Sequence, residues 1–539
     1  MDTRISCVLI LFSYGCCSHL YLTDEYEFKT VFRGVRDRNG YIKARNEVIL
    51  AESNMRIGRD VVLDKTEQRV NDILMKYKEL EINKSRTLNG APFPPSIDFL
   101  VSKPMVEKSQ VFQIIKLMPK GAALHLHDCS MVDLNWLVKN ATYRENCYMC
   151  VNVNYTVYFK FFGGTPPSNP GCPWKSVKTE RAKARNVDEF DRMLYMNMSL
   201  ITPDPRKAYP TIDVVWDRFS QTLDQANGLI NYAPVFADYF YEALNEFNLD
   251  NVQYLEFRGL FPEVYELDGS TKDRNWVVKT YNDLFEKFTA DHKHEFSGGK
   301  MIYSGIRVVP EIDILNQVKE AIHYRQLYPD HFAGYDLVGQ EDPGVPLVKY
   351  LDALLYPSEQ TPPVDLPYFF HAGETDWEGT PTDNNLIDAV LLNTSRIGHG
   401  YAIVKHPQVM KMVKERNIAV EVNPISNQVL LLLSDLRNHP AAELVAQDFP
   451  VVISADDPAV WGAQGLSYDF YMAFMALSGE TTDLRLLKKL AINSIQYSAM
   501  TPIEKSKALN LWRQKWDAFI QRMLHQVNQS GSFPLNPFG

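Results

Sequence analysis

Histidine and carboxylate residues stand at the ends of short apolar runs in this sequence, where they could bind a metal ion and move protons. One run, Pro367–Glu374 (PYFFHAGE), is a buried-strand pattern that ends with His371 and Glu374, three residues apart. Histidine is the commonest transition-metal ligand, and a glutamate beside it suits proton transfer. A pair of this kind is more often structural than catalytic, so other segments must supply the remaining ligands.

Three other segments carry groups of the same kind: HLHD at 125–128, GHG at 398–400 and SADDP at 454–458. Because side chains alternate along a strand, His125 and His127 point to the same side. Three nitrogens and one oxygen without a thiolate suit a catalytic zinc ion with a position left for water. The predicted zinc ligands are His125, His127, His371 and Asp456.

The elements that must position these groups are eight β-prone runs that alternate with longer helical runs from Lys120 onward. The predicted strands are Ala122–His127, Val252–Arg258, Met301–Val308, Phe332–Leu337, Tyr368–His371, Arg396–His399, Ile418–Val422 and Val451–Ala455. This count predicts an α/β fold, a TIM (β/α)8 barrel, whose catalytic face lies at the C-terminal ends of the strands. The fourth run ends without a lysine that could be carbamylated to bridge two metals, so one zinc ion per subunit is expected.

Two regions lie outside this alternation. Tyr41–Ile82 is a run of helix formers with only Gly58 as a breaker, and it predicts a helical arm. The arm must bury its apolar face on its own barrel or on a second copy, and Ala91–Pro95 reads as the linker after it. More than a hundred residues separate the first two strands, which predicts a large insertion near the barrel mouth, with helices at Thr211–Leu223 and Tyr232–Phe247.

The N-terminus predicts export. One basic residue, Arg4, precedes the short apolar run Ile5–Cys17, the pattern of a signal peptide cleaved near Cys17–His19; a buried N-terminal helix is the alternative. No later stretch reaches the roughly 18 apolar residues of a membrane span. Candidate glycosylation sequons start at Asn83, Asn140, Asn154, Asn197, Asn393 and Asn528.

Cysteine placement agrees with an oxidising compartment. Cys147, Cys150 and Cys172 lie in one Pro/Gly-rich segment, which predicts one local disulfide. The spacing does not choose the pair. It also leaves open zinc binding by Cys147 and Cys150, although no second pair stands nearby.

Composition limits the classes of partner. The 539 residues are 45% apolar, enough for one barrel-sized domain and a substantial accessory region. The net charge is −10 and no long Lys/Arg run occurs, which argues against a nucleic-acid-binding surface and a polybasic membrane patch.

Taken in order, the motifs His-x-His, His-Ala-Gly-Glu, Gly-His-Gly and Ser-x-Asp-Asp-Pro resemble those of the adenosine deaminase branch of the metal-dependent amidohydrolases. The signal, the arm, the cysteine-bearing insertion and Asn423–Gln428 (NPISNQ) narrow the resemblance to the secreted adenosine deaminase-related growth factors. It covers almost the whole mature chain.

The resemblance implies a role for each site residue. Glu374 would protonate N1 of the purine, and His399 would orient or deprotonate the attacking water. Asp457 would face N7, and the backbone of Gly339 would donate to N3. Asp128 and Trp216 would lie on the ribose side, and Cys150 and Cys172 would pair, leaving Cys147 unpaired.

It also implies a domain plan and partners. A signal peptide (1–18), a dimerisation arm (19–105) and a deaminase barrel (106–539) are expected, with a receptor- or glycan-binding module inserted at 140–199. The expected protein is a secreted homodimer that converts adenosine, and 2'-deoxyadenosine, to inosine-type products and ammonia. One departure concerns Ile306, near which the family pattern has a histidine that helps to form the substrate pocket; substrate affinity and selectivity therefore stay open.

Two alternatives share parts of this pattern. An extracellular receptor- or glycan-binding growth factor with weak or no catalysis would use the insertion, but a binding scaffold has no need of a full set of acid, base and ligands. Another amidohydrolase, acting on AMP, adenine or an amide, would share the metal chemistry. A phosphorylated substrate calls for a cationic site, which the sequence does not locate.

Overall fold

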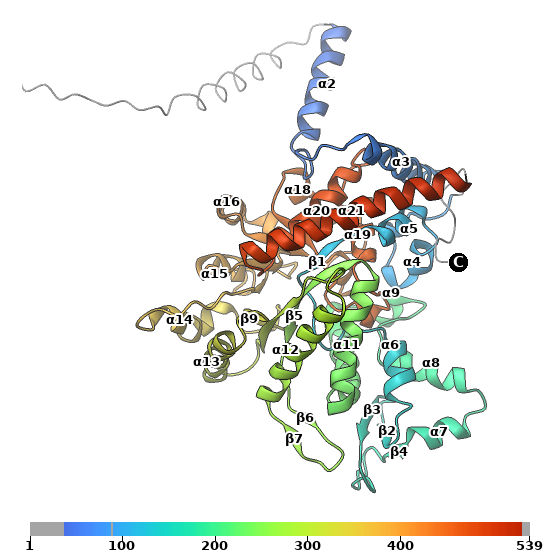
Figure 1. The fold of residues 1–539 in the computed structure, drawn as a ribbon, viewed down its shortest axis with the longest axis vertical. Helices are drawn as coiled ribbons and strands as arrows, with labels where there is room; N and C mark the ends of the chain where they lie inside the picture. The colour runs from blue at the N-terminus through green and yellow to red at the C-terminus, as the bar shows by residue number, and fades with distance from the viewer. Residues whose placement is uncertain (1–36, 88–89, 531–539) are drawn as a thin grey trace, which may run out of the picture.

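Eight parallel strands form the centre of the protein (Figure 1). The computed structural model describes residues 37–87 and 90–530. The first four barrel strands are β1 (Gly121–Ala123), β5 (Val252–Gly259), β8 (Gly299–Ile306) and β9 (Phe332–Val338), paired in that order. The other four are β10 (His371–Ala372), β11 (Arg396–His399), β12 (Ala419–Val422) and β13 (Val451–Ile453).

Isolated parallel bridges join these two sheets at both edges. Tyr335 on β9 pairs with Tyr368 just before β10, and Leu126 pairs with Asp456 after β13. The barrel is therefore closed, and the predicted TIM fold is confirmed. The first strand is shorter than predicted because side chains occupy part of its ladder: Arg258 donates to the carbonyl of Leu124 at 2.7 Å.

Helices cover the outside of the barrel between successive strands, so that β5, β8 and β9 are buried almost throughout. These helices are α11 (Ala233–Leu249), α12 (Arg274–Asp291), α13 (Glu311–Leu327), α14 (Leu351–Glu359), α15 (Asn385–Leu391), α16 (Pro407–Arg416) and α18 (Ala441–Ala446). Helix α17 (Pro424–Val429) instead lies at the barrel mouth, where Ser426 contacts Asp456. After β13 follow α19 (Ser467–Met475), α20 (Leu484–Gln496) and α21 (Pro502–Ser530).

The N-terminal helical run is two helices, α2 (Arg38–Ser53) and α3 (Lys65–Ser85). The break contains Gly58, whose φ is +90° and whose backbone lies so close to α20 that a Cβ would be 2.8 Å from the carbonyl oxygen of Arg485. Helix α3 packs on the barrel domain, where Glu67 accepts a 2.6 Å hydrogen bond from the indole of Trp516. Helix α2 extends away from the rest of the protein (Figure 1), and Ala44 is its one buried residue.

The segment between α3 and β1 belongs with the barrel rather than with a free linker. Pro95 is buried in a short 3-10 turn, Pro94–Ser96, and α4 (Phe99–Val106) and α5 (Gln110–Leu117) follow. The backbone N–H of Phe99 donates to Gln428 beside the barrel mouth at 2.9 Å. The predicted linker is thus a packed connection.

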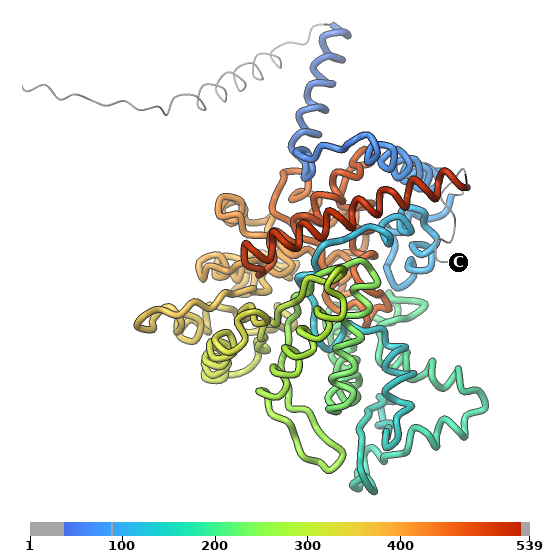
Figure 2. Tube along the Cα trace, in the orientation of Figure 1, coloured from blue at the N-terminus to red at the C-terminus, as the bar shows by residue number. Residues whose placement is uncertain are grey.

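The insertion after β1 forms a lobe at the end of the molecule opposite α2 (Figure 2). Strands β2 (Cys147–Val151), β3 (Val157–Phe161) and β4 (Lys175–Ser176) make an antiparallel sheet, followed by α7 (Val177–Lys183) and α8 (Val187–Asn197). A disulfide joins Cys150 to Cys172, while Cys147 is a buried free thiol. The chain then returns to the barrel mouth through α10 (Ile212–Ile230), which begins one residue after the start of the first predicted helix of this region and extends seven residues beyond its end.

Several sequence predictions concern the surface and the termini. The signal peptide, residues 1–18, lies outside the described residues. Among the sequon asparagines, Asn197 is half-buried and the other five are exposed. Within residues 37–87 and 90–530, the helices all fall short of the length and apolar character that crossing a membrane requires.

Replacing Gly58 with alanine should destabilise the protein, because the left-handed backbone and the nearby carbonyl of Arg485 both oppose a Cβ. We expect a loss of about 1–3 kcal/mol, measured by thermal and denaturant unfolding. Gly40→Ala is the matched control, since a Cβ there meets nothing closer than 3.6 Å. Equal stability of the two variants would contradict this account of the helix break.

Candidate active site

The predicted metal ligands converge at the C-terminal mouth of the barrel, although they come from three distant parts of the chain. One donor atom from each of His125, His127, His371 and Asp456 lies within 4.8 Å of the others. Asp456 Oδ1 is 3.3 Å from Nε2 of His125 and 3.0 Å from Nε2 of His127. Both histidines face the same side, as strand alternation requires.

Buried carboxylates orient two of these histidines. Nδ1 of His125 is 2.7 Å from Glu421 on β12, and Nδ1 of His371 is 2.7 Å from Asp336 on β9. A carboxylate at Nδ1 fixes the ring proton there and leaves Nε2 with a lone pair for a metal ion. Arg258 binds both carboxylates, at 3.0 Å to Asp336 and 2.6 Å to Glu421.

These donors fit a metal ion. Although Nε2 of His125 and Oδ1 of Asp456 lie 3.3 Å apart, neither buried atom makes a well-oriented hydrogen bond within the described part of the chain, which is costly unless a ligand satisfies them. The hydroxyl of Ser426 donates to the other carboxylate oxygen of Asp456 at 2.7 Å, leaving Oδ1 for the ion. Imidazole and carboxylate donors without a thiolate are typical of catalytic zinc sites.

The strand ends that carry this site are conformationally strained. His399 and Asp456 both have φ near +60°, a region that side chains other than glycine seldom adopt. The packed barrel must hold each of them there at a cost of order 1–3 kcal/mol. Such strain is common where a fold aims side chains at a ligand.

Glu374 and His399 lie beside the ligand cluster. Oε1 of Glu374 is 3.4 Å from Nδ1 of His399, whose Nε2 is 3.7 Å from Asp456. Burial, together with the charges of Asp456 and Glu341, raises the pKa of Glu374 well above that of an ordinary glutamate. This carboxyl group therefore suits a proton donor at neutral pH.

Glu341 fixes the backbone that carries Glu374. Its buried carboxylate accepts hydrogen bonds from the N–H groups of Gly373, at 3.1 Å, and Glu374, at 2.6 Å. The side-chain amide of Asn385 donates to the same carboxylate at 2.7 Å. The carboxylate of Glu341, in the loop after β9, thus holds the loop after β10 in place.

A cavity of about 300 Å³ lies in front of the ligands and contains all four predicted substrate-side residues: Asp128, Trp216, Gly339 and Asp457. Helix α10 forms one wall through Trp216 and further residues on the same helix face: Phe219, Ser220, Leu223 and Asn227. Gly339 has φ +102°, which only glycine adopts readily. Ile306, near which the resemblance led us to expect a histidine, also lines the cavity and is 40% exposed.

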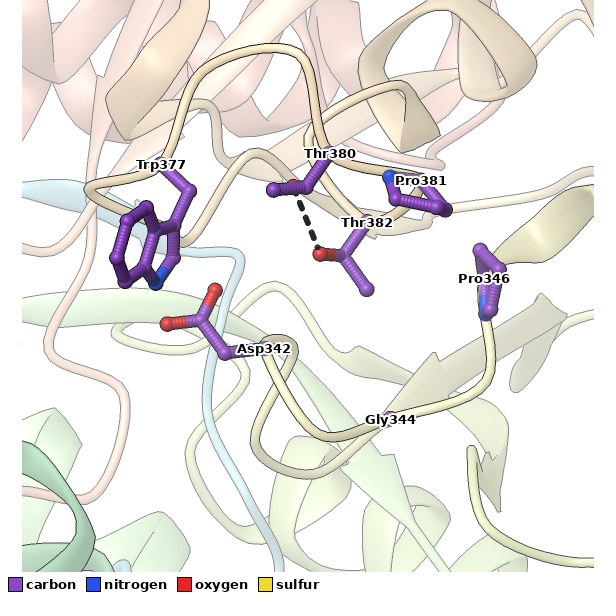
Figure 3. Close-up of a pocket in the computed structure, with 7 residues that line it drawn as sticks. All are labelled: Asp342, Gly344, Pro346, Trp377, Thr380, Pro381 and Thr382. Atoms are coloured by element: carbon purple, nitrogen blue, oxygen red, sulfur yellow. Dashed lines mark hydrogen bonds between the residues drawn. The ribbon is translucent and has the colours of Figure 1, made fainter.

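A second cavity, of about 490 Å³, lies on the loops after β9 and β10 (Figure 3). Trp377, Asp342 and Thr382 face it, and a 3.2 Å hydrogen bond joins Thr380 to Thr382. Asp342 also accepts from Thr375, one residue after Glu374. Its lining has a single carboxylate and no histidine, so the metal chemistry belongs to the first cavity.

Sequence reasoning missed the residues behind the ligands: Asp336, Glu341, Glu421, Ser426 and Arg258. Three of them carry a signal that could have been used, because a charged residue inside an apolar strand must have a buried partner. Asp336 and Glu421 stand within predicted strands of this kind, and Arg258 ends another. Nothing local in the sequence marks Glu341.

Comparison with known proteins agrees with this geometry. A family profile described as "Adenosine deaminase" matches residues 203–512, and one described as "Adenosine/AMP deaminase N-terminal" matches residues 32–115. Adenosine deaminase 2 of Pongo abelii is 47% identical over 480 residues, covering 89% of this chain and 93% of that protein. An adenosine deaminase of Phlebotomus duboscqi is 40% identical, covering 91% and 94%.

Among solved structures, the N6-mAMP deaminase of Arabidopsis matches with a TM-score of 0.53 and 18% identity. The match covers 75% of this chain and 99% of that one, and at this identity it supports the fold alone. The sequence matches extend over both the barrel and the N-terminal helices. They show that the chain belongs to the adenosine deaminase family of hydrolytic enzymes.

Proposed function

We propose that this protein is a secreted, zinc-dependent adenosine deaminase that hydrolyses adenosine to inosine and ammonia, and 2'-deoxyadenosine likewise. The observation that carries the proposal is that the cluster of His125, His127, His371 and Asp456 lies beside Glu374 and His399, and that all of these residues except the fully buried His125 line one cavity. The family membership and the relatives named adenosine deaminase support the same reaction.

Each residue has a proposed task in this reaction. The three histidines and Asp456 would hold the zinc ion, whose chemistry when bound would be to make water available as a nucleophile near neutral pH. Glu374 gives a proton to N1 of the purine, so that no full negative charge develops on the ring while C6 is attacked. His399 holds the attacking oxygen in place. When the proton of the added C6 hydroxyl passes to the C6 amino group, the C–N bond breaks, ammonia leaves and the C6 carbonyl of inosine forms.

The remaining cavity residues are proposed to hold the nucleoside. Asp457 faces N7 and the N–H of Gly339 donates to N3, while Asp128 and Trp216 lie on the ribose side. The hydroxyls of Ser130 and Tyr281 donate to Asp457 and Asp128, respectively, which fixes both carboxylates. Ile306 offers only an apolar surface here, so it would contribute contact area rather than a hydrogen bond to the substrate.

The regions outside the barrel support proposals about location and partners. Residues 1–18 are proposed to be a signal peptide, residues 19–105 an arm, and residues 106–539 the barrel. Exposed apolar residues on α2 support a homodimer through this arm: Tyr41, Ile42, Ile49 and Leu50. The 140–199 module, which exposes Val153 and Tyr155, is the proposed receptor- or glycan-binding face, and growth-factor activity would follow from adenosine depletion.

Removing the metal ion should abolish the activity. Incubation of the secreted protein with adenosine should lower the adenosine absorbance band, and a zinc chelator should stop this change. Added zinc should restore it, because the ligands are held in place by Glu421 and Asp336. Unchanged activity in protein shown by elemental analysis to be metal-free would contradict the proposed role of zinc.

Replacing Glu374 with glutamine should leave zinc binding intact but slow turnover by a factor on the order of 10² or more, because the amide cannot supply the proton to N1. Steady-state kinetics and the zinc content are measured together. Glu378→Gln is the matched control, since it removes an exposed carboxylate from the same loop. Near-normal turnover of the Glu374 variant would remove its assigned role.

Deleting residues 20–53 should convert the proposed dimer into a monomer while leaving α3 on the barrel, where Lys78 donates to Thr482 O at 2.8 Å. The molar mass is measured by light scattering. The full-length double variant I49D/L50D, which places charge on the exposed face of α2, should also be monomeric. An unchanged mass in both proteins would reject α2 as the interface.

A further inference from the structure

Three side chains form a hydrogen-bonded chain that ends on His399. The backbone N–H of Ala441 donates to Nδ1 of His439 at 3.0 Å. Nε2 of His439 is 3.0 Å from Oδ1 of Asn427, and Nδ2 of Asn427 is 3.0 Å from Nδ1 of His399. All three side chains are buried, so water does not replace these bonds.

The direction of donation along this chain is fixed at its first member. A backbone N–H can only donate, so Nδ1 of His439 must accept. Burial lowers the pKa of His439 to about 3, which keeps the ring neutral and places its single proton on Nε2. That proton is donated to Oδ1 of Asn427, and this settles which end of the amide faces His399.

The amide nitrogen of Asn427 therefore donates to Nδ1 of His399. A ring nitrogen that accepts a hydrogen bond carries no proton, so the proton of His399 can lie only on Nε2, the nitrogen 3.7 Å from Asp456. Glu374 approaches the same Nδ1 only to 3.4 Å, farther than the 3.0 Å of Asn427. The lone pair of Nδ1 is thus occupied by Asn427, and the proton of Glu374 is left for another acceptor.

We propose that Asn427 and His439 are positioning residues that fix the proton of His399 on Nε2, so that His399 presents a hydrogen-bond donor, not a base, to the attacking oxygen. The inference rests on the proposed function for the identity of that oxygen. The inference goes beyond the family resemblance, which implies only that His399 either orients or deprotonates the attacking water.

The direct test is nitrogen NMR of the zinc-loaded protein labelled with 15N-histidine, because protonated and unprotonated ring nitrogens differ widely in chemical shift. The signals of His399 are identified by their loss in His399→Gln. We expect a protonated Nε2 and an unprotonated Nδ1. A protonated Nδ1 in the unmodified protein would overturn the proposal, whether or not adenosine is turned over, so the two proposals fail separately.

Asn427→Asp provides the matching perturbation, since a carboxylate has no proton to donate and must accept one from Nδ1 of His399. We expect the Nδ1 signal to move to the protonated range and kcat to fall on the order of 10²–10⁴-fold, as for a catalytic histidine held in the wrong tautomer. KM should change little. Asn438→Asp, on an exposed side chain nearby, adds the same charge and should leave both readouts unchanged.

A second variant distinguishes tautomer control from loop packing. His439→Phe keeps a ring against Tyr401 but removes the donor to Asn427. In the otherwise unmodified protein kcat should fall about 10-fold, and in the Asn427→Asp background no further loss should occur, because the two residues act as one unit. Independent, additive losses with an unchanged Nδ1 signal would assign both residues a merely structural role and overturn the proposal.

Discussion

Together with Arg396, which also binds Glu421, the buried guanidinium of Arg258 holds the carboxylates that orient the predicted metal ligands. It lies between Asp336 and Glu421, and each of these acids orients one histidine through Nδ1. Removing one member of such a buried network leaves an uncompensated charge, at a cost of about 3–5 kcal/mol. The network therefore couples stability to function, because the strands β5, β9 and β12 cannot shift without moving a ligand.

Barrel closure is the second constraint, because it brings the ligands of the two halves together. The bridge between Leu126 and Asp456 connects the last strand to the first, and the N–H of Asp456 donates to the carbonyl of His125 at 3.1 Å. Two ligands from opposite ends of the barrel sequence thus share a backbone hydrogen bond. The closed frame holds the strained, left-handed backbone of Asp456 and His399 in place.

The strand ends were predictable from the sequence because each ligand sits next to the apolar run that positions it. The barrel, the large insertion and the helix that lines the cavity were predicted from the lengths of the β-prone and helix-forming segments and from the spacing between them. The helical arm predicted over Tyr41–Ile82 is two helices, because Gly58, its one breaker, adopts a left-handed turn where its backbone meets α20. Glu341 could not be found, since its partners lie in another loop and only the fold brings them together. His439 could not be found either, because nothing local in the sequence marks it as the partner of Asn427, which stands twelve residues earlier.

The central claim is that these four side chains bind one zinc ion, and diffraction from crystals at energies on either side of the zinc absorption edge tests it most directly. The account predicts a single anomalous peak per subunit, about 2.0–2.2 Å from Nε2 of His125, His127 and His371 and from a carboxylate oxygen of Asp456. A peak at any other place, or fully folded and active protein without a zinc peak, would contradict it.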